Sequence, residues 1–212
     1  MPKNELIRIL IAEDHLIARA GMATIIGAQE DMIVVAEAAD GKQALALYRA
    51  DPPDVVLMDM RMPVMTGYEA AAAIRVEFPK ARIIALSTFG GDEDIRRALR
   101  AGAQAFLTKD MHQDELIGAI RAVHSGHQYL PASVLATLAA QDPMPELSAR
   151  ELEVLNLLVQ GLSNKQIAFE LGIAEDTGKN HVKSVLRKLG THDRTRASTD
   201  AIQRGFIHLE HK

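Results

Sequence analysis

The chain has 212 residues and a formal net charge of −4, which leaves room for one large or two small globular domains. It contains no cysteine, so disulfides and thiolate metal sites are excluded, and the composition fits a reducing compartment such as the cytoplasm. Because no apolar run approaches the roughly 18 residues of a membrane span and the polar start Met1–Asn4 is unlike a signal peptide, we expect a cytoplasmic protein without a membrane partner.

Residues 5–127 alternate between short apolar runs and helical patterns. Strands are expected near residues 7–12, 33–37, 54–59, 82–87 and 104–108. Helices are expected near residues 15–28, 41–50, 66–78, 92–101 and 112–126. Because a helical pattern separates each strand from the next, the strands should be parallel. The sequence therefore predicts an α/β fold, a doubly wound five-stranded parallel sheet of the flavodoxin-like type.

Polar side chains stand where four of these strands end. Glu13 and Asp14 follow the first strand, Asp59 ends the third, Ser87 ends the fourth, and Lys109 lies just past the fifth. The carboxyl ends of parallel strands meet at one edge of the sheet, which is where such sheets bind ligands. The pattern predicts a site for a divalent cation and a phosphoryl group, with Asp59 as the nucleophile.

The residue types suit that chemistry. Three carboxylates brought together repel one another, and a hard dication such as Mg²⁺ relieves the repulsion and neutralises an incoming phosphoryl donor. Lys109 can stabilise the transferred group with its positive charge, and Ser87 can donate a hydrogen bond to it.

Residues 128–145 differ from what precedes them. A short helix is expected over Ala132–Ala140, and the run from Asp142 to Pro145 should break it, because proline disfavours helix at the residue before it. The expected domains are residues 1–127, a linker over 128–145 with that short helix, and residues 146–212.

The C-terminal domain is expected to be all-helical. Two capping-box patterns, Ser148–Glu151 and Ser163–Gln166, each open a helix that a glycine ends. After a turn at Ile173–Asp176, a third helix is expected over 177–189, and Asp193 caps a fourth.

The third of these helices is basic on one side. Residues 177–196 hold six basic side chains and one acid, although the whole chain is acidic. Lys179, Lys183 and Arg187 recur in steps of four, with Asn180 beside the first. Such a stripe fits the major groove of double-stranded DNA, where cations neutralise phosphates and an Asn can pair with an adenine edge. An ordinary amphipathic helix with a solvated basic face is the alternative.

Residues 5–127 resemble the receiver domain of two-component response regulators. The motifs that carry the likeness are Ala12-Glu13-Asp14, Leu57-Met58-Asp59-Met60-Arg61-Met62-Pro63, Ser87, Phe106 and Lys109. One departure is Thr66, where the family more often has an acidic or amide residue.

The resemblance implies a set of roles. Mg²⁺ is expected to be bound by Asp14, Asp59 and the backbone carbonyl of Arg61, with Glu13 acting mainly through water. A sensor histidine kinase is the implied donor, and Asp59 becomes an aspartyl phosphate. Lys109 matches the invariant lysine of the family, and the implied switch residues are Ser87 and Phe106.

The C-terminal region resembles the LuxR-type helix-turn-helix. The motifs are Leu147–Leu155, Gly161–Ala168 and Lys179-Asn180-His181-Val182. The resemblance implies that helix 177–189 is the recognition helix. Groove-facing positions are then Lys179, Asn180 and Lys183, and phosphate contacts are Ser163, Asn164, Lys165, Thr177 and Arg187. Gly178, where the family usually has a valine, puts the rigidity of this helix in doubt.

Together the two regions are similar to a NarL/FixJ-type response regulator. The expected function is a DNA-binding regulator, not an enzyme, that is phosphorylated on Asp59, controls transcription and forms a homodimer on phosphorylation or DNA binding. A phosphatase with an Asp59 nucleophile is disfavoured, because that superfamily typically needs a second Asp where this chain has Arg61. A receptor for a small apolar signal is disfavoured by the packed-sheet pattern. A phosphorylation-independent DNA-binding factor with a silent receiver stays open.

Overall fold

A computed structural model describes residues 6–141 and 145–208 of the chain. Its contacts divide the chain into two compact units, one of residues 1–90 and 95–136 and the other of residues 91–94 and 137–212. Three residues on which the expected break rests, Asp142, Pro143 and Met144, lie outside the described residues. Among the described residues, no helix is both long and apolar enough to cross a membrane.

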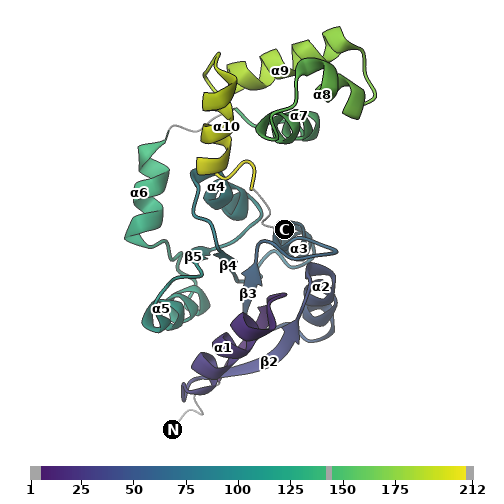
Figure 1. The fold of residues 1–212 in the computed structure, drawn as a ribbon. Helices are drawn as coiled ribbons and strands as arrows, with labels where there is room; N and C mark the ends of the chain where they lie inside the picture. The colour runs from purple at the N-terminus through teal and green to yellow at the C-terminus, as the bar shows by residue number, and fades with distance from the viewer. Residues whose placement is uncertain (1–5, 142–144, 209–212) are drawn as a thin grey trace. The chain divides into compact units, whose positions relative to one another are not determined.

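The first unit is built on the predicted five-stranded parallel sheet, which is confirmed (Figure 1). The strands are β1 (Ile7–Ala12), β2 (Met32–Ala38), β3 (Val55–Asp59), β4 (Ile83–Ser87) and β5 (Ala105–Thr108), in the order β2-β1-β3-β4-β5. The helices that separate and follow these strands in the sequence are α1 (Leu16–Gly27), α2 (Gly41–Ala50), α3 (Gly67–Glu77), α4 (Asp92–Arg100) and α5 (Gln113–His124). The element bounds lie within two residues of those that the hydrophobic pattern predicts.

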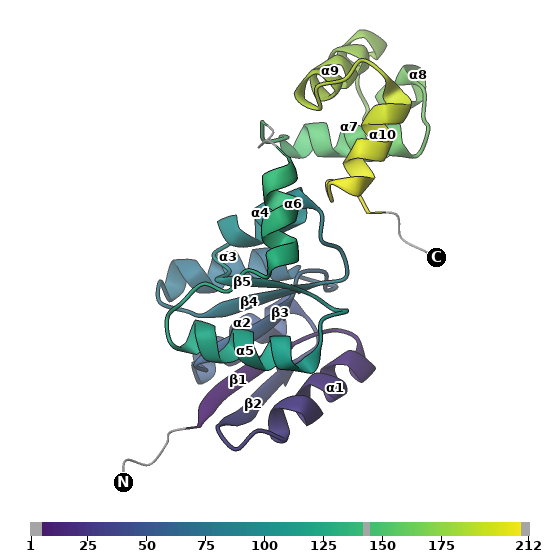
Figure 2. The ribbon, with the colours of Figure 1, turned by 90° about the vertical axis from the view of Figure 1, so that its left-hand side faces the viewer.

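Helices cover both faces of this sheet. Helices α1 and α5 pack on one face, where Ile26 and Ile120 join a core that includes Ile9 and Leu57 (Figure 2). Helices α2 and α3 lie on the other face. The inner strands β3 and β4 are therefore buried along their whole length, whereas in the edge strand β2 exposed residues alternate with partly buried ones between two buried ends.

The second unit is helical. It contains α7 (Ala149–Val159), α8 (Asn164–Glu170), α9 (Glu175–Lys188) and α10 (Arg194–Gln203), and α6 (Ala132–Ala140) covers the residues of the expected short helix. Both predicted capping boxes are present, at Ser148 with Glu151 and at Ser163 with Gln166. Apolar residues of α7, α8, α9 and α10 form one core, among them Leu155, Ile167, Val185 and Ala197.

The start of α9 corrects the expected turn over Ile173–Asp176. The helix begins at Glu175, with Ala174 as its N-cap, and not at residue 177. Glu175 and Asp176 therefore lie in the first turn, where negative charge interacts favourably with the helix dipole. An alanine cannot cap with its side chain, so the sequence carries no capping signal at this position.

Gly178 is a buried contact point between two helices. A Cβ atom at this residue would lie 3.0 Å from the Cβ of Ala168 on α8, closer than ordinary van der Waals contact. The missing side chain therefore allows α9 to approach α8, and the helix continues through this residue without a break. The close packing of the two helices at Gly178 offsets the weak helix propensity of glycine, for which the sequence suggested a less rigid helix.

Glu151 links the beginning of α7 to the end of α9. One carboxylate oxygen accepts from Ser184 Oγ at 2.9 Å, and the other accepts from Lys188 Nζ at 2.7 Å and from the Ser148 backbone N–H at 2.8 Å. Burial alone would raise the pKa of Glu151, but the hydrogen bonds from Lys188, Ser148 and Ser184 outweigh it and lower the pKa to about 2. The ionised form is thus bound firmly in the folded domain.

We expect Glu151→Gln to destabilise the C-terminal unit by about 2 to 3 kcal/mol at pH 7. The pKa of Glu151 is depressed in the folded state, so its contribution is full above the ordinary value of 4.5 and is lost as pH falls toward about 2. Hydrogen exchange of the α7 and α9 amides in the full chain, followed from pH 7 down to the acid range, measures both effects. Glu153→Gln is the control, because the exposed pair of Glu153 with Arg150 on the same helix should contribute less than about 1 kcal/mol. Equal losses of protection in the two variants would contradict the expectation.

Candidate functional site

The carboxyl edge of the sheet brings together the polar residues that follow its strands. Asp59, the last residue of β3, is 2% exposed, and Glu13, which follows β1, is fully buried. Asp14 lies beside Glu13 with a side chain that is 28% exposed. Lys109 follows β5 and reaches both buried carboxylates. The predicted convergence of these four residues therefore occurs in the structure.

Lys109 is the cation between the two buried acids. Its Nζ donates to Asp59 Oδ2 at 2.7 Å and to Glu13 Oε1 at 3.0 Å. Burial alone would lower the pKa of Lys109, but its hydrogen bonds with Asp59 and Glu13 outweigh burial and raise the pKa. The ammonium group therefore stays charged and fixes the two carboxylates about a single point.

One lysine does not balance these acids. Burial raises the pKa of Asp59 to about 6, although hydrogen bonds from Lys109 and from the Arg61 backbone N–H act to lower it. The Arg61 N–H lies 3.0 Å from Asp59 Oδ1. Burial disfavours the ionised form of Asp59, and a second cation beside the carboxylate would stabilise that form. The electrostatics of the site therefore favour binding of a positive ion.

The donor set fits a divalent cation. Ligand atoms of Glu13, Asp14, His15 and Asp59 all lie within 4.8 Å of one another. Glu13 Oε2 is buried and pairs with Lys109 Nζ at 2.7 Å, and Asp14 Oδ1 is buried with the His15 ring nitrogen 3.0 Å away. Carboxylate oxygens of this kind are the ligands that Mg²⁺ prefers. The sequence did not predict that His15 lies in this cluster, because a polar residue between a strand and a helix is ordinarily interpreted as an N-cap.

The two expected switch residues lie on neighbouring strands. Ser87 is 1% exposed at the end of β4, and its Oγ accepts a hydrogen bond from the Phe89 N–H at 3.1 Å. Phe106 on β5 pairs with Ala85 of β4 and is fully buried. The hydroxyl therefore stands at the sheet edge with Asp59, whereas the aromatic ring is part of the core.

The loop between β3 and α3 packs closely against Asp59. A Cβ atom at Gly67 would lie 2.0 Å from the carbonyl oxygen of Asp59, so only glycine fits there. Thr66, at which this chain departs from the family pattern, is the N-cap of α3 and forms a reciprocal capping box with Glu69. A threonine therefore stabilises the beginning of the helix at this position. Val64 has a φ of 66°, a left-handed conformation that is unfavourable for a β-branched residue.

A second candidate site lies on α9. An open groove of about 540 Å³ runs along this helix, and its polar lining consists of Asn164, Lys179, Asn180, Lys183, Ser184, Arg187 and His192. Five of the eight residues expected to contact DNA thus share one surface. The other three, Ser163, Lys165 and Thr177, are exposed but do not line the groove.

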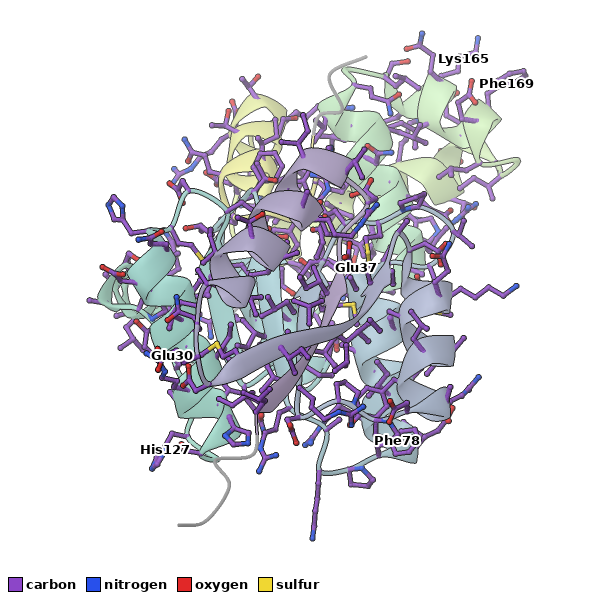
Figure 3. All side chains as sticks on the ribbon, turned by 90° about the horizontal axis from the view of Figure 1, so that it is seen from below. Glu30, Glu37, Phe78, His127, Lys165 and Phe169 are labelled. Carbon is purple, nitrogen blue, oxygen red and sulfur yellow. The ribbon has the colours of Figure 1, made fainter. Side chains whose placement is uncertain are left out.

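Several of these side chains are already engaged. Lys179 lies 3.1 Å from Glu175 and 3.4 Å from Asp176, and its hydrogen bond with Glu175 raises the pKa of its ammonium group. Asn164 Oδ1 accepts from Arg194 at 2.8 Å, so Arg194, which the sequence did not suggest, orients that amide. By contrast, Lys165 projects from α8 in Figure 3, as does Phe169, which is 83% exposed.

Comparisons with known proteins agree with this arrangement. Residues 9–121 match the family model of the response regulator receiver domain, and residues 145–201 match that of bacterial regulatory proteins of the luxR family. The transcriptional regulatory protein LnrK of Bacillus subtilis (strain 168) is 36% identical, over 94% of this chain and 98% of that protein. The crystal structure of response regulator ChrA of a heme-sensing two-component system is 36% identical with a TM-score of 0.57, over 95% of this chain and 99% of that one. The structure of response regulator RcsB in complex with DNA is 25% identical with a TM-score of 0.67, over 92% of this chain and 98% of that one.

We expect Val64→Gly to stabilise the first unit by about 1 kcal/mol, because glycine adopts the left-handed conformation without the penalty of roughly 1 to 2 kcal/mol that a side chain carries. Val76→Gly is a matched control, since Val76 is also 82% exposed but lies in α3. That change should destabilise the unit by roughly 0.5 to 1 kcal/mol. Urea unfolding followed by circular dichroism measures both changes. Destabilisation by Val64→Gly would show that removing the side chain from this left-handed residue does not stabilise the folded unit.

Proposed function

Because the chain belongs to the response regulators that join a receiver domain to a LuxR-type DNA-binding domain, we propose that Asp59 accepts a phosphoryl group and that this modification controls DNA binding. The observation that carries the proposal is the buried Asp59 carboxylate held by Lys109 beside two further acids. The donor would be the phosphohistidine of a sensor histidine kinase. The chain would act as a regulator rather than an enzyme, in the cytoplasm where bacterial DNA lies.

The residues of the site divide the chemistry among them. Asp14, Asp59 and the carbonyl of Arg61 would hold Mg²⁺, with Glu13 acting mainly through water. The bound ion supplies neutralisation of the charge on the phosphoryl donor. An Asp59 oxygen attacks phosphorus as the bond from phosphorus to the histidine nitrogen breaks, and the electron pair of that bond leaves with the imidazole. Lys109 stabilises the charge on the transferred group.

Phosphorylation would then act through Ser87 and Phe106. The Ser87 hydroxyl accepts one backbone hydrogen bond and keeps its own proton to donate to a phosphoryl oxygen. A shift of Ser87 would disturb the packing of Phe106, because β4 and β5 are adjacent strands. Such a change needs to supply only a few kcal/mol of differential stability to favour another state, which we propose is a DNA-binding homodimer.

The second domain would bind double-stranded DNA through α9. Lys183, Asn180 and Arg187 line one groove, with Lys179 held at its start by two acids. This arrangement suits phosphate contacts by the cations and base contact by the amide. The related protein solved in complex with DNA supports the assignment of the partner.

Asp59→Asn should abolish labelling by acetyl phosphate with Mg²⁺, because the amide keeps the shape of the side chain but is not a nucleophile. Mass spectrometry of the intact protein should show one added phosphoryl group in the parent chain and none in the variant. Asp110→Asn, a change at an exposed acid one residue past Lys109, should be labelled like the parent. The raised pKa of Asp59 means that its ionised form is unfavourable in the folded protein, so Asp59→Asn should be at least as stable as the parent at pH 7 without metal. A stability measurement that shows this excludes misfolding as the cause of lost labelling. Labelling of the Asn variant would contradict the assignment of the nucleophile.

Changes on α9 should separate affinity from specificity. Lys183→Ala should weaken binding to all sequences and reduce the slope of log K against log salt by about 1. Asn180→Ala should relax preference at a single base position, with a loss of roughly 1 to 3 kcal/mol on the preferred site. Selection of bound DNA from a random pool, followed by salt titration, measures both. Lys80→Ala in the first unit is the control. Unchanged binding by both α9 variants would remove this helix from the groove.

The switch itself is tested on the full chain. Phosphorylated protein should bind the selected DNA more tightly than unphosphorylated protein and should dimerise at lower concentration, and Asp59→Asn should show neither change. Analytical ultracentrifugation and DNA titration with and without acetyl phosphate measure these differences. Equal affinity and equal oligomeric state in both forms would favour the alternative, a phosphorylation-independent DNA-binding factor with a silent receiver.

A further inference from the structure

We propose that Arg194 is a positioning residue for DNA binding. It holds the side-chain carbonyl of Asn164 so that the amide NH₂ group faces the open groove along α9 and donates to a DNA phosphate. The inference rests on the proposed function, because it concerns how the surface around α9 binds DNA. Arg194 belongs to α10, outside the helix that was predicted to recognise DNA.

The contacts of Arg194 fix the orientation of the Asn164 amide. Arg194 is the first residue of α10, and Asn164 is the first residue of α8. Nη1 of Arg194 donates to Asn164 Oδ1 at 2.8 Å, and its Nη2 donates to the Leu162 backbone carbonyl at 2.5 Å. A guanidinium group has only donors, so the amide atom that faces Arg194 must be the carbonyl oxygen. The NH₂ group of Asn164 therefore points away from Arg194.

The other end of this amide belongs to the surface of α9. Asn164 lines the groove along that helix, whereas Arg194 does not. The Asn164 backbone oxygen lies 3.4 Å from the place that a Cβ of Gly178 would take, so Asn164 lies beside the first turn of α9. Within the described part of the chain, the side chain of Asn164 makes no hydrogen bond except that with Arg194. Its NH₂ group is therefore free to donate to a ligand, and the cations Lys183 and Arg187 of the same groove favour an anionic one.

Arg194 also makes this amide a stronger donor. A hydrogen bond from a cation to the amide oxygen draws electron density away from the nitrogen, and bonds in such a chain polarise one another. Without Arg194, the amide could rotate and present its oxygen to the phosphate, which would repel it. The guanidinium group is half-buried behind the amide, so it acts on DNA through Asn164.

The experiment uses the full-length chain treated with acetyl phosphate and Mg²⁺. The probe is a fluorescein-labelled DNA duplex of arbitrary sequence, because a phosphate contact does not depend on the bases. Arg194→Lys keeps the positive charge but loses the planar pair of donors, so the affinity should fall by about fivefold, as for one lost hydrogen bond. Unchanged affinity in this variant would show that the charge alone matters and would overturn the inference.

A double-mutant cycle separates positioning from support of the fold. In the Asn164→Ala background, Arg194→Lys should change the affinity by less than about twofold, because no amide remains to be oriented. A residue that contacted DNA directly, or that only stabilised the domain, would cause the same loss with and without Asn164. Equal losses in the two backgrounds would therefore contradict a positioning role.

Asn164→Asp tests which end of the side chain meets DNA. The carboxylate has the shape of the amide and can still accept from Arg194, so thermal unfolding should show that the domain keeps its stability. It places a negative oxygen where the NH₂ group was, so the affinity for the duplex should fall by at least about tenfold. Parental affinity in this variant would rule out donation by the amide.

Arg196→Lys is the matched control on the same helix. The side chain of Arg196 is 74% exposed, pairs with Asp200 at 3.7 Å and does not line the groove, so this variant should bind like the parent. A fivefold loss here as well would show that the effect is not particular to Arg194. If the parent binds the duplex and Arg194→Lys binds equally well, only the role of Arg194 is wrong. If the parent does not bind DNA, the proposed function itself fails, and the inference falls with it.

Discussion

The first unit depends on an imbalance of charge among buried side chains at the carboxyl edge of its sheet. Two carboxylates, Glu13 and Asp59, are almost wholly removed from water and share one ammonium group, that of Lys109. Desolvation of an unbalanced anion is unfavourable, and the raised pKa of Asp59 records it. The fold tolerates this arrangement because strongly apolar strands carry the stability, and the unmet negative charge becomes an attraction for cations and for the groups that cations accompany.

The parallel sheet makes that imbalance possible. Helices cover both of its faces, so β3 and β4 are buried to their last residues and their ends remain shielded from water. Gly67 brings the next helix directly against the Asp59 carbonyl, and the strained Val64 lies in the same loop. The backbone strain and the closest packing of this loop therefore lie beside Asp59, where the chemistry is expected.

Much of this organisation could be predicted from the sequence, because it depends on local patterns. Apolar runs predict the strands, glycines and capping boxes predict most helix ends, and the polar residues at the ends of four strands indicate the candidate site. The start of α9 could not be predicted, because Ala174 offers no side-chain cap. The engagement of Lys179 by Glu175 followed from that missed turn. His15 was missed since its contacts depend on where Glu13 and Asp14 point, which no pattern of spacing specifies.

The contact between Gly178 and Ala168 has a consequence for changing what the second domain recognises. Recognition helices are attractive pieces to exchange between relatives, since a short segment carries most of the base contacts. In this chain the inward face of α9 lies against Ala168 on α8, whose Cβ is 3.0 Å from the place that a Cβ of Gly178 would take. A transplanted helix with valine at this point would be pushed away from α8, and under the proposed function it would then meet DNA at a different angle. The unit to exchange is therefore the α8–α9 pair, because a graft that keeps both helices together preserves the orientation of α9 in the domain.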